Sequence, residues 1–122
     1  MRSIFLALVA AVATWSPAAR AEFDLKLYRE LMRTPETKEK LSDYVTGLGR
    51  GIFYANAFLE VRESAPLFCM PGKLSLDQGL IESLLDQEIR KPASGNEYPD
   101  DTPIELIMVR AFMTRFPCEG AA

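Results

Sequence analysis

The chain contains only two cysteines, Cys69 and Cys118, and a proline lies within two residues of each. Their motifs read Phe-Cys-Met-Pro-Gly and Arg-Phe-Pro-Cys. A domain of about 100 residues is near the lower end of what one apolar core stabilises without a covalent bond. We therefore predict a structural disulfide between Cys69 and Cys118 that closes the second half of the chain into a helical hairpin. The alternative is a pair of free thiols.

The first 21 residues have the pattern of an export signal. Arg2 gives a positive start, residues 4–13 are apolar, and Ala19-Arg20-Ala21 has the small residues of a cleavage site. The alternative is a membrane anchor, which needs about 20 apolar residues, roughly twice the length of this run. We expect cleavage before Glu22, no stable membrane anchor afterwards, and a periplasmic location in which a disulfide forms.

Charge and composition favour a protein that binds another protein. Removal of the leader lowers the 14 basic residues to 12, against 17 acidic residues, for a net charge of −5. Nucleic acid is not an expected partner, because a phosphate backbone requires a basic stripe. Histidine is absent, which excludes histidine-assisted nucleophiles and histidine-containing metal sites. We expect no enzyme activity, no catalytic residues, no cofactor and no metal.

Apolar residues recur at spacings of three and four along most of the chain after the leader, and no segment alternates as a strand does. Proline and capping patterns divide this part of the chain, and Ser75 and Thr102 are the expected N-caps of the last two helices. The expected helices cover about residues 23–33, 35–62 and 75–91, and a fourth starts at Thr102-Pro103. The predicted fold is one all-α domain, residues 22–122, built as a bundle of four to five helices that one disulfide holds together.

Three glycines, Gly47, Gly49 and Gly51, interrupt the longest expected helix. Each costs about 1 kcal/mol relative to alanine in a helix interior, so a packing gain should offset it. We expect Gly47 and Gly51, one turn apart, to let another helix backbone approach closely; the alternative is a kink at Gly49. A phosphate-binding loop is disfavoured, because it needs a strand before the glycines and a fuller glycine pattern than this one.

Residues 92–101 are predicted to form an exposed acidic loop. Its candidate partner-binding residues are Glu97, Tyr98, Asp100 and Asp101. In one interpretation the loop is a solvated connector whose acids favour the next helix dipole. In the other, Tyr98 enters a cleft of a partner while the three acids favour encounter with a basic rim.

The last expected helix is apolar on two faces. Its first face contains Ile104, Ile107, Met108, Ala111 and Phe112, and its second contains Leu106, Val109, Met113 and Phe116. A helix that is apolar nearly all round is either central in the fold or covered by a second copy of the chain. A homodimer is therefore possible.

Four features, taken in order, make the chain similar to the Rap/Tai family of immunity proteins. They are Asp43–Gly47, Phe68–Pro71, Leu74–Gln78 and Ala111–Cys118. The resemblance implies a helical periplasmic domain whose partner is a peptidoglycan amidase delivered by type VI secretion. Many members have two further cysteines, and Met32 and Leu41 occupy those places here.

The expected function is that of an exported immunity protein, an inhibitor that neutralises a peptidoglycan-degrading amidase by covering its active site. The alternative is a periplasmic stress protein or chaperone. A chaperone of that kind would expose apolar surface in acid, as its carboxylates become protonated.

Overall fold

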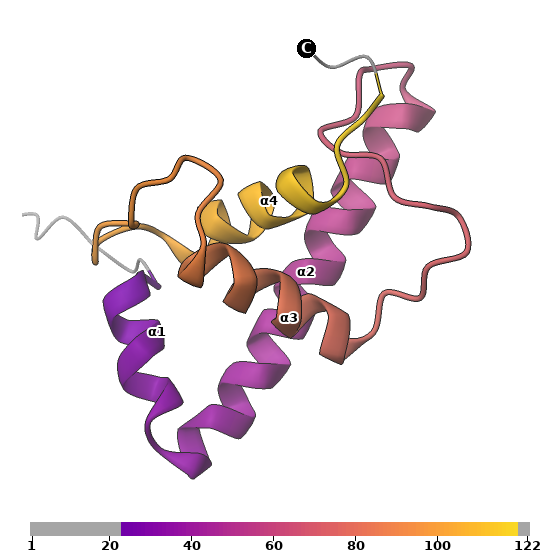
Figure 1. Ribbon diagram of the computed structural model, residues 1–122. Helices are drawn as coiled ribbons and strands as arrows, with labels where there is room; N and C mark the ends of the chain where they lie inside the picture. Colours follow the sequence, from indigo (N-terminus) through magenta and orange to yellow (C-terminus); the bar gives the residue numbers. More distant parts are fainter. Residues whose placement is uncertain (1–22, 120–122) are drawn as a thin grey trace, which may run out of the picture.

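The computed structural model describes residues 23–119, which form four α-helices and contain no strand (Figure 1). The helices are α1 (Leu25–Met32), α2 (Pro35–Val61), α3 (Gln78–Arg90) and α4 (Ile104–Arg115). The predicted all-α fold with one disulfide is confirmed, and the predicted leader, residues 1–21, lies outside the described residues. No helix between residues 23 and 119 is long and apolar enough to cross a membrane.

Helices α1 and α2 form a hairpin that opens as a V, with α3 lying across it (Figure 1). Pro35 is the first residue of α2, as the sequence predicts, because a proline lacks the amide that a helix interior needs. Thr34 occupies the cap position, although its side chain makes no capping hydrogen bond. The Thr37 hydroxyl instead donates to the Leu31 carbonyl oxygen at 2.7 Å and fixes the turn between the two helices.

The core lies where α3 and α4 pack against each other and against one side of α2. The first face of α4 is buried as predicted, and it meets Ile81, Leu84 and Leu85 of α3 and Val45 of α2. The second face of α4 stays partly open: Leu106 is 42% exposed and Met113 is 43% exposed.

The disulfide joins Cys69 to Cys118 with a Cα–Cα distance of 4.8 Å. It connects the segment after α2 to the end of α4, so that α3 and α4 lie between the two cysteines. The Cys69 amide donates to the Phe116 carbonyl oxygen at 2.8 Å. Beside it, the rings of Phe68 and Phe112 stack with centroids 4.7 Å apart. The predicted covalent closure of the second half of the chain is confirmed.

A buried asparagine in α2 holds the segment that leads to the disulfide. The Asn56 side-chain amide donates to the Phe68 carbonyl oxygen at 2.8 Å. Its oxygen accepts from the amides of Leu67 at 2.7 Å and Phe68 at 3.3 Å. Because Asn56 is only 6% exposed, these bonds satisfy the polar atoms of its buried side chain.

Two predicted helix caps are wrong. Helix α3 begins at Gln78, and Asp77 rather than Ser75 caps it by accepting from the Leu80 amide at 2.8 Å. Asp77 directly precedes the first helical residue, and an aspartate caps as well as a serine does in this position. Ser75 lies two residues further from the helix. At the start of α4 the Ile104 amide donates to the Phe23 carbonyl oxygen at 2.9 Å, so a tertiary contact replaces the expected Thr102 cap.

The predicted close packing at Gly47 and Gly51 is also wrong. A Cβ atom added at either residue would meet no atom within 4 Å. The central glycine packs instead: a Cβ at Gly49 would lie 2.5 Å from the Ile81 side chain of α3. The reason is helical geometry, because Gly49 shares the inward face of α2 with Val45 and Asn56 while the outer two glycines face away from it.

Candidate functional site

Tyr98 is buried, so the prediction that it is an exposed partner-binding anchor is wrong. Only 9% of the residue is exposed, and its hydroxyl donates to Oε1 of the buried Glu88 at 2.6 Å. The Arg110 guanidinium lies over the tyrosine ring, 5.6 Å from its centroid. Burial raises the pKa of the Tyr98 phenol above its ordinary value, and the hydrogen bond to Glu88 raises it further, while Arg110 opposes both. The Tyr98 ring therefore packs at the end of the core and does not project into solvent towards a partner.

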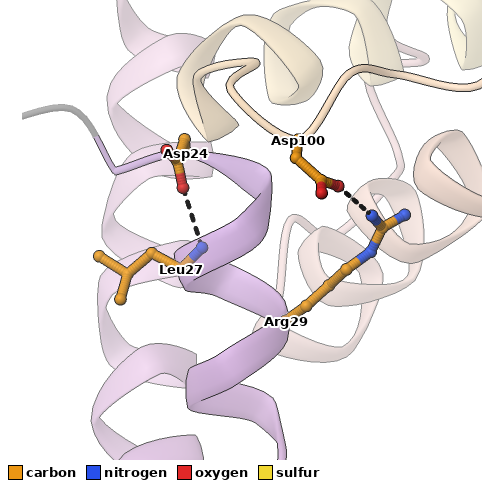
Figure 2. Close-up of polar contacts among 4 residues, drawn as sticks. All are labelled: Asp24, Leu27, Arg29 and Asp100. Atoms are coloured by element: carbon orange, nitrogen blue, oxygen red, sulfur yellow. Dashed lines mark hydrogen bonds and ion pairs between the residues drawn. The ribbon is translucent and has the colours of Figure 1, made fainter.

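Asp100 supports the first helix. Its carboxylate pairs with the Arg29 guanidinium at 2.9 Å (Figure 2). Its carbonyl oxygen accepts from the Lys26 amide at 3.0 Å, and the Thr102 carbonyl oxygen accepts from the Leu25 amide at 2.9 Å. The exposed ion pair is worth at most about 1 kcal/mol, so the backbone bonds matter more.

The start of α1 is therefore fully capped. Figure 2 shows Asp24 accepting from the third amide of the helix, that of Leu27, at 2.9 Å. Two amides are held by the loop before α4 and the third by Asp24. Of the four predicted loop residues, three are exposed as expected, namely Glu97, Asp100 and Asp101, and their role in partner binding stays a prediction.

A groove of about 880 Å³ opens between α1, the first half of α2 and the first half of α3. Tyr28 and Met32 of α1 form one wall. The remaining lining comes from α2 and α3: Pro35, Lys38, Glu39, Leu41, Ser42, Asp43, Val45, Gln78, Gly79, Glu82, Ser83 and Asp86. The lining residues thus come from α1 and α2, the two helices that form the V in Figure 1, and from α3.

The groove is acidic. It is lined by four carboxylates, from Glu39, Asp43, Glu82 and Asp86, and by one basic residue, Lys38. Burial raises the pKa of the Tyr28 phenol, and the negative charges of Asp86 and then Glu82 raise it further. Burial is the main cause of this shift in the pKa of Tyr28, and the two groove carboxylates act in the same direction.

Hydrogen bonds fix part of the groove wall. The Ser42 hydroxyl of α2 donates to Oε1 of Glu82 on α3. The Gln78 side-chain amide donates to the same Glu82 oxygen at 3.1 Å and to the Ser42 hydroxyl. These bonds link α2 to α3 at the groove, so the position of the Glu82 carboxylate is set before any partner arrives.

Sequence reasoning missed the groove because its walls come from segments far apart in the chain. One signal was available. Glu39 and Asp43 on α2, and Glu82 and Asp86 on α3, are like-charged pairs at the spacing of one helical turn. Such pairs cost a few tenths of a kcal/mol in a helix, although the ion pair of Asp86 with Arg90 offsets part of that cost, so the sequence marks only a local excess of negative charge.

A second surface is the outward face of α2, which we define as Asp43, Gly47, Gly51, Tyr54, Phe58 and Val61. All six residues are exposed. The fractional exposure is 61% for Tyr54, 65% for Phe58 and 77% for Val61. Large apolar side chains grouped on one exposed face are typical of a surface that contacts another protein.

Comparison of the chain with protein-family models, with curated proteins and with solved structures finds no match. Between residues 23 and 119, no group of three or more carboxylate or cysteine side chains is placed to hold a metal ion.

Proposed function

We propose that this protein is an exported inhibitor that binds another protein through the acidic groove, and that its partner is a peptidoglycan amidase. The observation that carries the proposal is the groove itself. The identity of the partner rests on the resemblance to Rap/Tai immunity proteins described above.

The size and charge of the groove suit a basic protein segment. Its volume of about 880 Å³ accommodates several side chains. Four carboxylates around a concave surface attract lysine and arginine, and concave, low-dielectric walls strengthen their field. Tyr28 and Met32 supply apolar contact for the stems of such side chains. The net charge of −5 after loss of the leader also favours encounter with a basic partner.

The protein would then inhibit its partner by steric exclusion of the substrate. If the groove holds a basic segment at the rim of the partner's catalytic cleft, the helices that form the groove walls cover that cleft. The inhibitor needs no chemistry of its own, because exclusion of the substrate is sufficient.

The test compares two charge reversals of equal size on different surfaces. The double variant Glu39→Lys with Asp86→Lys reverses two groove carboxylates, and Glu97→Lys with Asp101→Lys reverses two exposed loop carboxylates. A hydrolase encoded beside this gene is the partner to use. We expect the groove variant to lose at least tenfold in affinity, about 1.4 kcal/mol, and to stop protecting peptidoglycan.

The loop variant is the matched control, and it should retain its affinity. Equal affinity of the groove variant and the parent contradicts the proposal. Loss in the loop variant alone would return the site to the predicted loop.

The chaperone alternative is supported by the exposed apolar side chains on the outward face of α2. An acid titration followed by binding of an apolar dye separates the two functions. An inhibitor should bind the dye to a similar extent as pH falls, whereas a chaperone activated by acid should bind much more.

A further inference from the structure

The walls of the acidic groove differ in chemistry. One wall is formed by Tyr28 and Met32 of α1, and another carries Glu82 and Asp86 of α3. The negative charges of Asp86 and Glu82 both act on the Tyr28 phenol, so the ring lies near the two carboxylates within the groove. The groove therefore combines an aromatic ring with two carboxylates, which is a more specific arrangement than negative charge alone.

The two carboxylates lie on one side of α3 and are only partly occupied. Glu82 and Asp86 are four residues apart, which places their Cβ atoms about 6 Å from each other. Oε1 of Glu82 accepts from Ser42 and Gln78, and Oδ2 of Asp86 pairs with Arg90. Among the described residues, no group donates to Oε2 of Glu82 or to Oδ1 of Asp86. Each carboxylate thus has one oxygen available to a ligand.

We propose that the groove selects arginine over lysine in the segment that it binds. This inference rests on the proposed function and specifies the side chain that the groove recognises. The guanidinium lies against the Tyr28 ring and donates to the available oxygens of Glu82 and Asp86. Met32, which is 39% exposed, packs on the apolar stem of the arginine.

This arrangement suits a guanidinium better than an ammonium. A guanidinium is planar, has five N–H donors in fixed directions, and stacks on aromatic rings. Two acceptor oxygens from different side chains, with a ring beside them, match such a flat donor. A lysine ammonium is compact and strongly hydrated, so it is attracted by the same charges but loses more hydration and gains less from the ring.

Charge complementarity identifies a peptide segment as the occupant. Four carboxylates line the groove together with one lysine, Lys38. At about 880 Å³ the groove is larger than one side chain, so the neighbours of the arginine in its own chain occupy the rest. A small inorganic cation has no flat or apolar surface with which to contact Tyr28 and Met32.

The experiment compares two synthetic peptides of equal charge, with the disulfide of the protein intact. Each peptide has several basic residues separated by glycine, all arginine in one and all lysine in the other. Isothermal titration at low salt should show about fivefold tighter binding of the arginine peptide, the gain expected from a partly exposed cation–π contact. Amide shifts in NMR spectra should map the peptide to α1 and α3.

Two substitutions test the recognition. Tyr28→Leu should remove the preference for arginine, whereas Tyr28→Phe keeps the ring and should keep the preference. Glu82→Gln should weaken binding of the arginine peptide about tenfold, because the amide oxygen still accepts from Ser42 but the negative charge is lost.

Tyr54→Leu and Glu97→Gln are the matched controls, since both residues are exposed and neither lines the groove. They should leave both affinities unchanged. Thermal melting of each variant checks that it folds.

Equal affinities of the parent for the two peptides, no binding of either peptide, or a preference that Tyr28→Leu leaves unchanged would each overturn the proposal. Displacement of the arginine peptide by an equal concentration of calcium would also overturn it, because the groove would then accept any cation. The peptides contain no part of the hydrolase, so this result is separate from the test of the proposed function. A groove that selects arginine while the hydrolase binds elsewhere would contradict only the function, and a hydrolase that binds the groove without peptide selectivity would contradict only the arginine site.

Discussion

The hydroxyl of Tyr98 donates a hydrogen bond of 2.6 Å to the carboxylate of Glu88, which is only 4% exposed. The same Glu88 oxygen accepts from the Ala93 amide at 3.3 Å. A buried carboxylate is costly unless it is hydrogen-bonded, so these two bonds hold the loop between α3 and α4 against the end of α3. The loop in turn caps α1 through Asp100 and Thr102. One buried pair therefore connects three helices.

Replacement of Tyr98 by phenylalanine should destabilise the fold by about 1–3 kcal/mol, because the buried Glu88 carboxylate loses a hydrogen bond. The measurement is urea unfolding at neutral pH. Glu97→Gln, one residue away and exposed, is the control and should change the free energy of unfolding little. Equal midpoints for the parent and Tyr98→Phe would show that the bond makes no net contribution.

Asn56→Ala should destabilise the protein more than an ordinary polar substitution does. It removes three hydrogen bonds and leaves buried backbone groups of Phe68 without partners. We expect a loss of about 2–4 kcal/mol in the free energy of unfolding. Asn96→Ala, in the exposed part of the loop, is the matched control. A loss below that of the control would mean that water replaces the Asn56 side chain.

The disulfide should contribute strongly to stability. Its cysteines are 49 residues apart, and closing a segment of that length restricts the unfolded chain by about 4 kcal/mol in the entropy model. The double variant Cys69→Ser with Cys118→Ser should lower the urea midpoint accordingly. Titration of the native, unreduced parent should find no free thiol, and two free thiols would contradict the bond.

Periodicity and proline punctuation predicted the helices well because they are local signals. The inward face of α4, from Ile104 to Phe112, followed from spacing alone, and Pro35 marked the start of α2 correctly. The cysteine pair followed from composition together with the predicted compartment. None of these features depends on how one helix crosses another.

The errors concern direction in space. The sequence shows three glycines in α2, but only the position of Ile81 on α3 decides that Gly49 packs and that Gly47 and Gly51 do not. Tyr98 lies in a polar loop, and its burial depends on Glu88 ten residues earlier. The groove depends on the angle between α1 and α2 and on the place of α3. No local pattern specifies these long-range relationships.

The glycines allow a paired prediction. Gly49→Ala should destabilise the fold, because its Cβ would lie 2.5 Å from the Ile81 side chain and the inward face of α2 must shift. Gly51→Ala should stabilise it by up to about 1 kcal/mol, since alanine favours the helix and meets no neighbour. Thermal melting of both variants under the same conditions checks the pair. Two changes of the same sign would contradict the packing described for α2.

The last prediction concerns alkaline pH. Burial raises the pKa of the Tyr44 phenol from its ordinary value of 10.0 to about 12, and its hydrogen bond to Glu105 adds to the effect. The folded state therefore keeps this proton at a pH where the unfolded chain has released it. Stability from this phenol is fully present below pH 10.0 and is lost as pH rises to about 12.

Tyr44→Phe isolates this contribution, because phenylalanine does not ionise and the other titrating groups are common to both proteins. We expect the parent to be more stable than the variant below pH 10.0, and the difference to shrink as pH approaches about 12. The effect should be modest, since Tyr44 is 41% exposed and water screens it. Urea unfolding at several pH values, with phenolate absorbance recorded in the native state, makes the measurement. Glu105→Gln should lower the pH at which Tyr44 ionises, because it removes the negative partner. A stability difference that stays constant across this pH range would show that the Tyr44 phenol titrates alike in the folded and unfolded chains.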